Sequence, residues 1–569
     1  MKHLNRLWIL GLLALVFLLV IPASAQDQGN IITRSTFGSG PINFNPVTSS
    51  SSDEQEVMNR LYPNLLGVDP VTALITPGAP GGMAESWDIS DDGTVYTFHL
   101  REGFAWSDGT PVTARDFEYT WDAIASGETE SPLAFLLDNP VVDFEALDDY
   151  TLKVTFTSAD CEALNSAGLQ PVPAHVFESG PFSALNDYNA DTPDALEVGP
   201  YQLASQITDQ QTGLIPATWD DPDGNAQNEG WIMRVFGDQT VEFEAFLAGE
   251  TTALDFIAPN RRSDVVAAQE AGSLNVYTYS PGDRYDYLAF NLADPNNPQN
   301  AYDENGNLIE QTPNMFFGDV RVRQALNMAV DVDAIIEGAV FGFGSRMSSS
   351  YAPGSWPYDP SVSTYEYNPE RALELLAEAG WIDHDNDPST PLIAQGAMYA
   401  PDGTEFAFSL LTNQGNTRRN AIGTITQDEL SRIGIKVDFQ SIDFNVLIEI
   451  LDQQTFDTVI LGWQNSYPFR ADQRQIFGST GDVIGGSNAG SYINPELDTL
   501  FAQASEVPNC DVEARKAIYG QIQQILRDDA PYLWMYSLDG MYSWDNTVNG
   551  VEPYPGTLYW NVQDWTRSS

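Results

Sequence analysis

The sequence has few of the residues that most often carry catalysis or bind nucleic acid. Its 569 residues include two cysteines, four histidines and four lysines, and acidic side chains outnumber basic ones by 80 to 25. A net charge of −55 would repel a polyanion, and no stretch concentrates basic residues, so no nucleic-acid partner is expected. The carboxylates predict a strongly solvated acidic surface, and attraction of cationic ligands or metal ions is the alternative.

Recognisable catalytic motifs are also missing. The sequence contains no Gly-x-Ser-x-Gly elbow, no zinc-type histidine pair and no phosphate-binding loop. With 80 carboxylates, acid–base pairs can be drawn anywhere, so a secreted polymer hydrolase stays an alternative class that no particular pair supports. We therefore expect a protein that is not an enzyme and that needs no cofactor.

The one long apolar run lies at the N-terminus. Lys2 and Arg6 precede the apolar segment 8–21, and Ala-Ser-Ala at 23–25 is a small-residue cleavage site, so residues 1–25 are predicted to be a cleaved signal peptide. A retained membrane anchor is the alternative, which the shortness of the run disfavours. Because no cysteine lies near the cleavage site, we expect no lipoprotein anchor and an extracytoplasmic protein, either periplasmic or secreted.

The two cysteines are Cys161 and Cys510, which lie far apart in the chain. In an exported protein they could form a disulfide. Two buried free thiols fit the sequence equally well, because a single distant pair does not define a disulfide framework.

A short acidic segment is the only candidate metal site. Asp383, Asp385 and Asp387 offer oxygen ligands at alternate positions, as calcium loops do. Pro388 occupies the place where such a loop needs glycine, and no bidentate glutamate follows at the right distance. We therefore expect a solvated acidic turn and no bound metal, with calcium as the alternative.

The segment 287–338 is the most informative stretch of the sequence. Residues 287–291 (YLAFN) are typical of a short aromatic strand, and Asp319 is the predicted N-cap of a helix with one apolar face. Asp331 or Asp333 then caps a second helix. A strand at a hinge, a polar loop and two capped helices are expected where a second lobe begins.

Local start signals predict further helices. Thr113 with Asp116 three residues later forms a capping box, and Asn368 precedes a proline at the first helical position. Another helix is predicted over 418–433, followed by an alternating strand at 435–439. Strand, helix and strand in succession predict an α/β lobe with a largely parallel sheet.

These patterns resemble the extracellular solute-binding proteins of family 5, the dipeptide, oligopeptide and nickel class that serves ABC importers. The clearest segments are 83–87 (MAESW), 106–117, 287–291, 316–338, 369–381 and 459–463. The resemblance implies an α/β, two-lobed periplasmic-binding-protein-like fold of the class II or cluster C type, with an extra subdomain in the first lobe.

The resemblance also implies a division of the chain. Lobe I would comprise residues 26–56, 190–280 and 530–569, the subdomain 57–189, and lobe II 281–529. The strand 532–537 would accordingly return to lobe I.

A function follows from the same resemblance. The protein would be a monomer that captures a solute between its lobes, closes, and docks on an ABC permease complex in the membrane. A small peptide is the first expectation. An oligosaccharide or other amphiphilic solute is the second, because the chain has 13 tryptophans and departs from the peptide-binding pattern.

That departure concerns the loop after Trp463. A tryptophan at the end of the buried strand 459–462 can stack on the apolar or sugar face of a ligand, and interlobe packing is the alternative. Peptide-binding relatives carry an aspartate shortly after this tryptophan, and here that acid is missing because Asn465 and Ser466 follow instead.

Other ligand contacts are implied by position alone. Phe44 and Asn45 fall where the family places its first ligand-facing loop, although a turn with an aromatic plug explains them equally well. Arg418 and Arg419 lie near a loop where some relatives hold the ligand's carboxylate, although a surface helix start is the alternative. The full set of candidates is Trp463, Asn465, Ser466, Phe44, Asn45, Arg418, Arg419 and Arg470.

Overall fold

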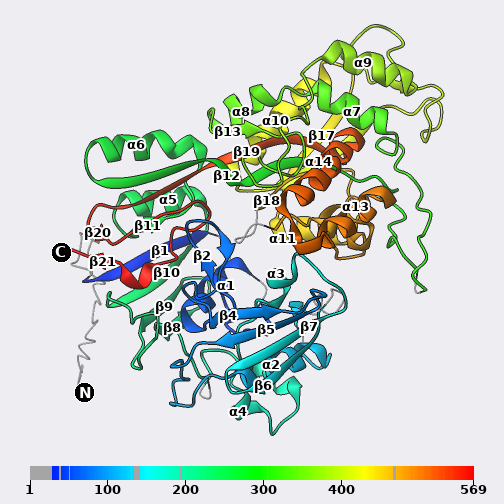
Figure 1. The fold of residues 1–569 in the computed structure, drawn as a ribbon. Helices are drawn as coiled ribbons and strands as arrows, with labels where there is room; N and C mark the ends of the chain where they lie inside the picture. The colour runs from blue at the N-terminus through cyan, green and yellow to red at the C-terminus, as the bar shows by residue number, and fades with distance from the viewer. Residues whose placement is uncertain are drawn as a thin grey trace, which may run out of the picture.

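The structure is a computed structural model that has two lobes joined by long strands (Figure 1). It describes residues 29–37, 40–49, 51–129, 131–133, 141–192, 195–303, 305–464 and 470–568, apart from the side chain of Asn509. The predicted signal peptide therefore lies outside the described residues. No helix in the described part of the chain combines the length and the hydrophobicity that a bilayer span needs.

One mixed sheet runs through both lobes. Its strand order is β17 (Lys436–Ile442), β16 (Ala407–Asn413), β18 (Thr458–Gln464), β12 (Leu274–Phe290), β19 (Tyr532–Asp545), β11 (Ala253–Leu254), β1 (Ile31–Phe37), β10 (Gly230–Phe236), β9 (Gln211–Pro216) and β8 (Tyr201–Ile207), and β13 (Gly344–Arg346) pairs with β19 beside this path. β16 is parallel to β17 and β18, whereas β12 is antiparallel to both β18 and β19. The expectation of a largely parallel sheet is therefore wrong around β12, because the chain leaves and returns through neighbouring strands.

β12 and β19 carry the chain between the lobes. Their pairing is interrupted between Tyr279 and Arg284 and resumes with Arg284 opposite Leu538. We use lobe I for described residues 29–279 and 540–568, and lobe II for 284–538. Leu533 and Met535 pack in the core of lobe II, so the return to lobe I comes after the predicted segment 532–537. The other predicted boundaries stay predictions.

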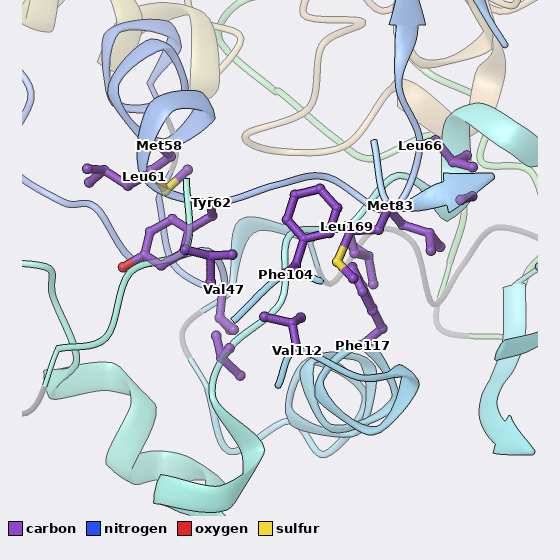
Figure 2. Packing of buried hydrophobic residues seen from close by; sticks show 14 of the residues in the cluster. Val47, Met58, Leu61, Tyr62, Leu66, Met83, Phe104, Val112, Phe117 and Leu169 are labelled. Carbon is purple, nitrogen blue, oxygen red and sulfur yellow. The ribbon is translucent and has the colours of Figure 1, made fainter. Parts of the chain in front are cut away.

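Lobe I and its subdomain share one continuous core. The subdomain sheet has the order β4 (Ala84–Ile89), β5 (Val95–Leu100), β7 (Thr151–Phe156) and β6 (Val141–Asp148). Figure 2 shows how Met58 and Leu61 of α1 (Ser52–Leu61) and Phe117 of α2 (Ala114–Ala125) enter the same cluster of buried hydrophobic residues. A shared core makes the subdomain a fixed wall of lobe I.

The remaining elements of lobe I complete this half. They are β2 (Val68–Asp69), β3 (Leu74–Ile75), α3 (Ala163–Ala167), α4 (Ala174–Phe177), α5 (Gln239–Leu247), α6 (Arg262–Glu270), β20 (Val548–Asn549) and β21 (Thr566–Arg567). Helices α5 and α6 lie beside the lobe I end of the sheet (Figure 1) and bury their own small cluster with β12 and β19.

Lobe II packs helices on both faces of its sheet. They are α7 (Val320–Ala329), α8 (Val332–Val340), α9 (Pro369–Glu378), α10 (Thr417–Ser431), α11 (Phe444–Asp452), α12 (Arg474–Phe477), α13 (Pro495–Ser505) and α14 (Val512–Asp529), with the short pair β14 (Trp381–Ile382) and β15 (Ile393–Ala394). One face carries α7, α8, α9 and α10, and the other carries α11, α13 and α14.

The predicted helix starts are confirmed. Asp319 caps α7, Asp331 caps α8 and Asn368 caps α9, each by accepting a hydrogen bond from a backbone N–H of the first turn. Asp116 accepts a 2.8 Å hydrogen bond from the N–H of Thr113, as the capping box requires. These signals are local, so the sequence is sufficient to predict them.

Glu197 is a buried carboxyl group in lobe I whose ionisation should make the stability of the protein depend on pH. Burial raises its pKa from 4.5 to about 7, although its side chain accepts a 2.8 Å hydrogen bond from the N–H of Leu203. A carboxyl group whose folded pKa is raised contributes full stability below its unfolded pKa of 4.5, and that contribution is lost as pH rises to 7.

We therefore expect Glu197→Gln to be more stable than wild type at pH 8 by about 1–3 kcal/mol, and the difference to vanish at pH 4.5. Urea unfolding at both pH values measures this difference, with the exposed Glu102→Gln as control. An equal effect of Glu197→Gln at the two pH values would contradict the assignment of a neutral buried acid.

Candidate functional site

A large cavity lies beside the hinge strands. It has a volume of about 500 Å³ and receives residues from lobe I, the subdomain and the hinge. Gln55 and Asn59 of α1 and Asn165 of α3 line it from lobe I, and Arg284 and Gln464 line it from the lobe II side. A cavity between two lobes that are joined by strands is where hinge motion would enclose a small molecule.

The hinge side of this cavity is polar and charged. Asp283 accepts hydrogen bonds from Tyr279 Oη at 3.1 Å and Gln464 Nε2 at 2.9 Å. The guanidinium of Arg284 lies over the ring of Phe256 at 4.9 Å and, among the described residues, forms no ion pair. The wall therefore offers both a carboxylate and a guanidinium to a ligand.

A second cavity of about 380 Å³ lies on the sheet of lobe II. Trp463 lines it together with Tyr287, Tyr532 and residues of α11 such as Phe444. Tyr287 stacks on Tyr532 with ring centroids 4.2 Å apart, and half-buried Trp463 stacks on Tyr287 at 6.3 Å. This aromatic stack gives the cavity a broad apolar wall that suits the apolar part of a ligand.

The opposite face of the same strands holds a buried ionic cluster around Asp286. Arg418 Nε donates to Asp286 Oδ2 at 2.6 Å, Arg419 Nε donates to Oδ1 at 3.3 Å, and Tyr536 Oη donates to Oδ2 at 2.7 Å. Burial would raise the pKa of Asp286, but the two guanidinium groups outweigh it and lower the pKa to about 2. A β-carbon at Gly462 would lie 2.7 Å from Asp286 Oδ1, so this close approach requires glycine.

The cluster explains two of the sequence candidates. Arg418 and Arg419 are largely buried, and both bind Asp286 rather than facing open solvent at a helix start. Arg419 also lines the second cavity, whereas Arg418 lines neither cavity. A ligand carboxylate would therefore have to compete with Asp286 for Arg419.

The other candidates are dispersed. Phe44 and Asn45 are fully buried in the core of lobe I, where Asn45 Nδ2 donates to the carbonyl of Leu185 at 2.6 Å, and neither lines a described cavity. Arg470 is half-buried. Asn465 and Ser466 lie outside the described residues.

The acidic turn is exposed, and its carboxylates accept hydrogen bonds from other residues of the same turn. Asp383 accepts from the N–H of Asn386 at 2.7 Å, and Asp385 accepts from Thr390 Oγ1 at 2.9 Å. Within the described residues, no group of three or more histidine, cysteine or acidic side chains is arranged to hold a metal ion.

Three residues that the sequence did not single out contribute to the larger cavity, namely Asp283, Arg284 and Gln464. Asp283 and Arg284 lie in the same strand β12, a few residues before the segment 287–291 that had marked the hinge. Because the chain has only 25 basic residues against 80 acidic ones, an arginine next to the predicted hinge could have been chosen from the sequence as a candidate ligand contact.

Because Asp286 compensates two buried guanidinium groups, we expect Asp286→Asn to destabilise the protein by about 3–5 kcal/mol at pH 7. Urea unfolding measures this loss, with the exposed Asp438→Asn as control within about 0.5 kcal/mol of wild type.

The pH dependence gives an independent check. A carboxyl group whose folded pKa is lowered from 3.8 to about 2 stabilises the fold fully above pH 3.8, and this contribution is lost as pH falls toward 2. The gap between wild type and Asp286→Asn should therefore narrow below pH 3.8, and a gap that stays constant there would refute the ionic role.

Comparison with known proteins places this architecture. The family model described as "Bacterial extracellular solute-binding proteins, family 5 Middle" matches residues 79–483. Oligopeptide-binding protein AppA of Bacillus subtilis (strain 168) is 26% identical over 555 residues, which cover 95% of this chain and 92% of AppA.

Solved structures agree with the fold. AppA from Bacillus subtilis in complex with a nonapeptide has a TM-score of 0.76 and 25% identity, covering 95% of this chain and 99% of that one. NikZ from Campylobacter jejuni in complex with Ni(L-His) has the same TM-score of 0.76 at 20% identity, covering 94% and 99%. The resemblance and the two-lobed α/β fold class are thus confirmed, and the chain belongs to family 5 of the bacterial extracellular solute-binding proteins.

Proposed function

We propose that this solute-binding protein captures a peptide-like solute in the cavity between its lobes and delivers it to an ABC permease in the membrane. The observation that carries the proposal is the cavity of about 500 Å³ beside β12 and β19, lined from both lobes in a chain whose relative AppA is an oligopeptide-binding protein. Closure around the solute would create the form that docks on the permease.

The chemistry of the two cavities fits a peptide. A peptide carries charged ends, backbone amides and side chains of varied polarity. Asp283 and Arg284 provide opposite charges at the hinge, and the aromatic stack behind Trp463 provides apolar surface in lobe II. We propose binding without chemical turnover, because the chain belongs to a family of solute-binding proteins and its relative AppA is an oligopeptide-binding protein.

Arg284 is the proposed contact for a ligand carboxylate. Unlike Arg418 and Arg419, it has no ion pair within the described residues, and it lines the cavity between the lobes. A charged hydrogen bond of this kind contributes about 1.5–3 kcal/mol.

We expect Arg284→Gln to weaken binding of peptides with a free carboxyl terminus by about 1.5–3 kcal/mol, and to affect the amidated peptides much less. Titration calorimetry with matched acid and amide peptides measures the difference. Arg115→Gln is the control, because Arg115 lies on α2 and lines neither cavity. Equal losses for acid and amide peptides would exclude the proposed contact.

Trp463 is the proposed apolar contact. We expect Trp463→Ala to weaken peptide binding by about 1–3 kcal/mol while the protein keeps its fold, because a large aromatic contact is removed from a cavity wall. The control is Trp87→Ala in the subdomain, since Trp87 is also half-buried and lines neither cavity.

Calorimetry and thermal unfolding distinguish the two roles of Trp463. If it served packing alone, the substitution would cost about 3–5 kcal/mol of unfolding free energy with or without peptide. A screen with peptide and glycan pools tests the solute class, since retention of glycans alone or cleavage of either pool would refute the proposal.

A further inference from the structure

A disulfide connects the subdomain to lobe II. Cys161 lies just before α3, and Cys510 lies between α13 and α14, with their α-carbons 5.4 Å apart. Figure 1 shows α3 next to the part of lobe II that carries α11 and α13, and far from helices α5 and α6 of lobe I. The pairing that the sequence left open is therefore formed, and it joins the two lobes.

Noncovalent contacts surround this disulfide. The N–H of Cys161 donates to the carbonyl of Ser505 at 2.8 Å. Glu162 forms an ion pair with Arg515, and these residues are only 9% and 8% exposed. The guanidinium of Arg515 also lies 5.0 Å from the ring of Trp356. The disulfide thus lies within a partly buried contact between the subdomain and lobe II that also contains a hydrogen bond and an ion pair.

The main chain itself crosses between the lobes at two places. One is in β12, between Tyr279 and Arg284, and the other is in β19, between Leu538 and Gly540. The disulfide adds a third covalent connection, which belongs to neither strand. Together the three connections close a ring through lobe I, the hinge and lobe II.

This ring includes a wall of the larger cavity. Leu164, Asn165 and Gly168 line that cavity, and they follow Cys161 by only a few residues. The covalent bond therefore fixes the α3 wall of the cavity to lobe II. Any movement that separates α3 from α13 and α14 would have to stretch this connection.

We propose that the Cys161–Cys510 disulfide is a strap that limits how far the lobes can open. The α-carbons of a disulfide reach at most about 6.8 Å, so this contact can widen by only about 1–2 Å. Opening is restricted to rotations that leave the strap nearly fixed. The consequence for solute exchange rests on the proposed function, whereas the restriction itself does not.

Small-angle X-ray scattering and hydrogen exchange, both without any solute, test the strap. We expect Cys161→Ser/Cys510→Ser to have a larger radius of gyration than wild type. Amides of 158–167 and 505–515 should exchange faster, on the order of tenfold. Glu162→Gln is the matched control: it removes the ion pair but keeps the disulfide, so its radius of gyration should equal that of wild type.

An unchanged radius of gyration and unchanged exchange in the double variant would overturn the proposal. If that variant fails to fold, wild type treated with a water-soluble phosphine replaces it. Each phosphine takes one oxygen from water to become the phosphine oxide while the disulfide gains two electrons and two protons as two thiols. Because no solute is used, failure of the strap is separate from failure of the peptide proposal.

Discussion

The antiparallel pairing of β12 with β19 is the constraint on which the rest of the structure depends. Both crossings between the lobes lie in these strands, and the interruption after Tyr279 marks the hinge. Asp286 of β12 accepts from Tyr536 of β19 and from two arginines of α10, so the same strands also anchor the helical layer of lobe II. The two strands that form the hinge therefore also hold α10 in the core of lobe II.

Strand alternation then decides which chemistry each face receives. Tyr285 and Tyr287 of β12 lie opposite Trp463 and Leu461 of β18, so aromatic side chains gather on the face that holds the second cavity. Asp286 points to the other face, where the arginines compensate it. A shift of one residue in this register would exchange the aromatic and ionic faces.

Features that depend on neighbouring residues could be predicted from the sequence, whereas contacts between residues far apart in the chain could not. Helix caps such as Asp319 and Asn368 depend on neighbours within one turn, and family motifs gave the two-lobed fold. The partner of Arg418 is Asp286, which lies 132 positions away, so no local pattern could show that this arginine is neutralised. The disulfide and the burial of Asn45 also depend on long-range packing.

The scarcity of positive charge connects these observations. In a chain with a net charge of −55, arginines that are held by carboxylates, such as Arg418, Arg419 and Arg515, serve to join distant segments. Arg284 differs, because it forms no ion pair within the described residues. Its guanidinium lies over Phe256 of lobe I, while its own residue belongs to lobe II. An anion bound by Arg284 would thus act directly on a contact between the lobes, which is where closure must be stabilised.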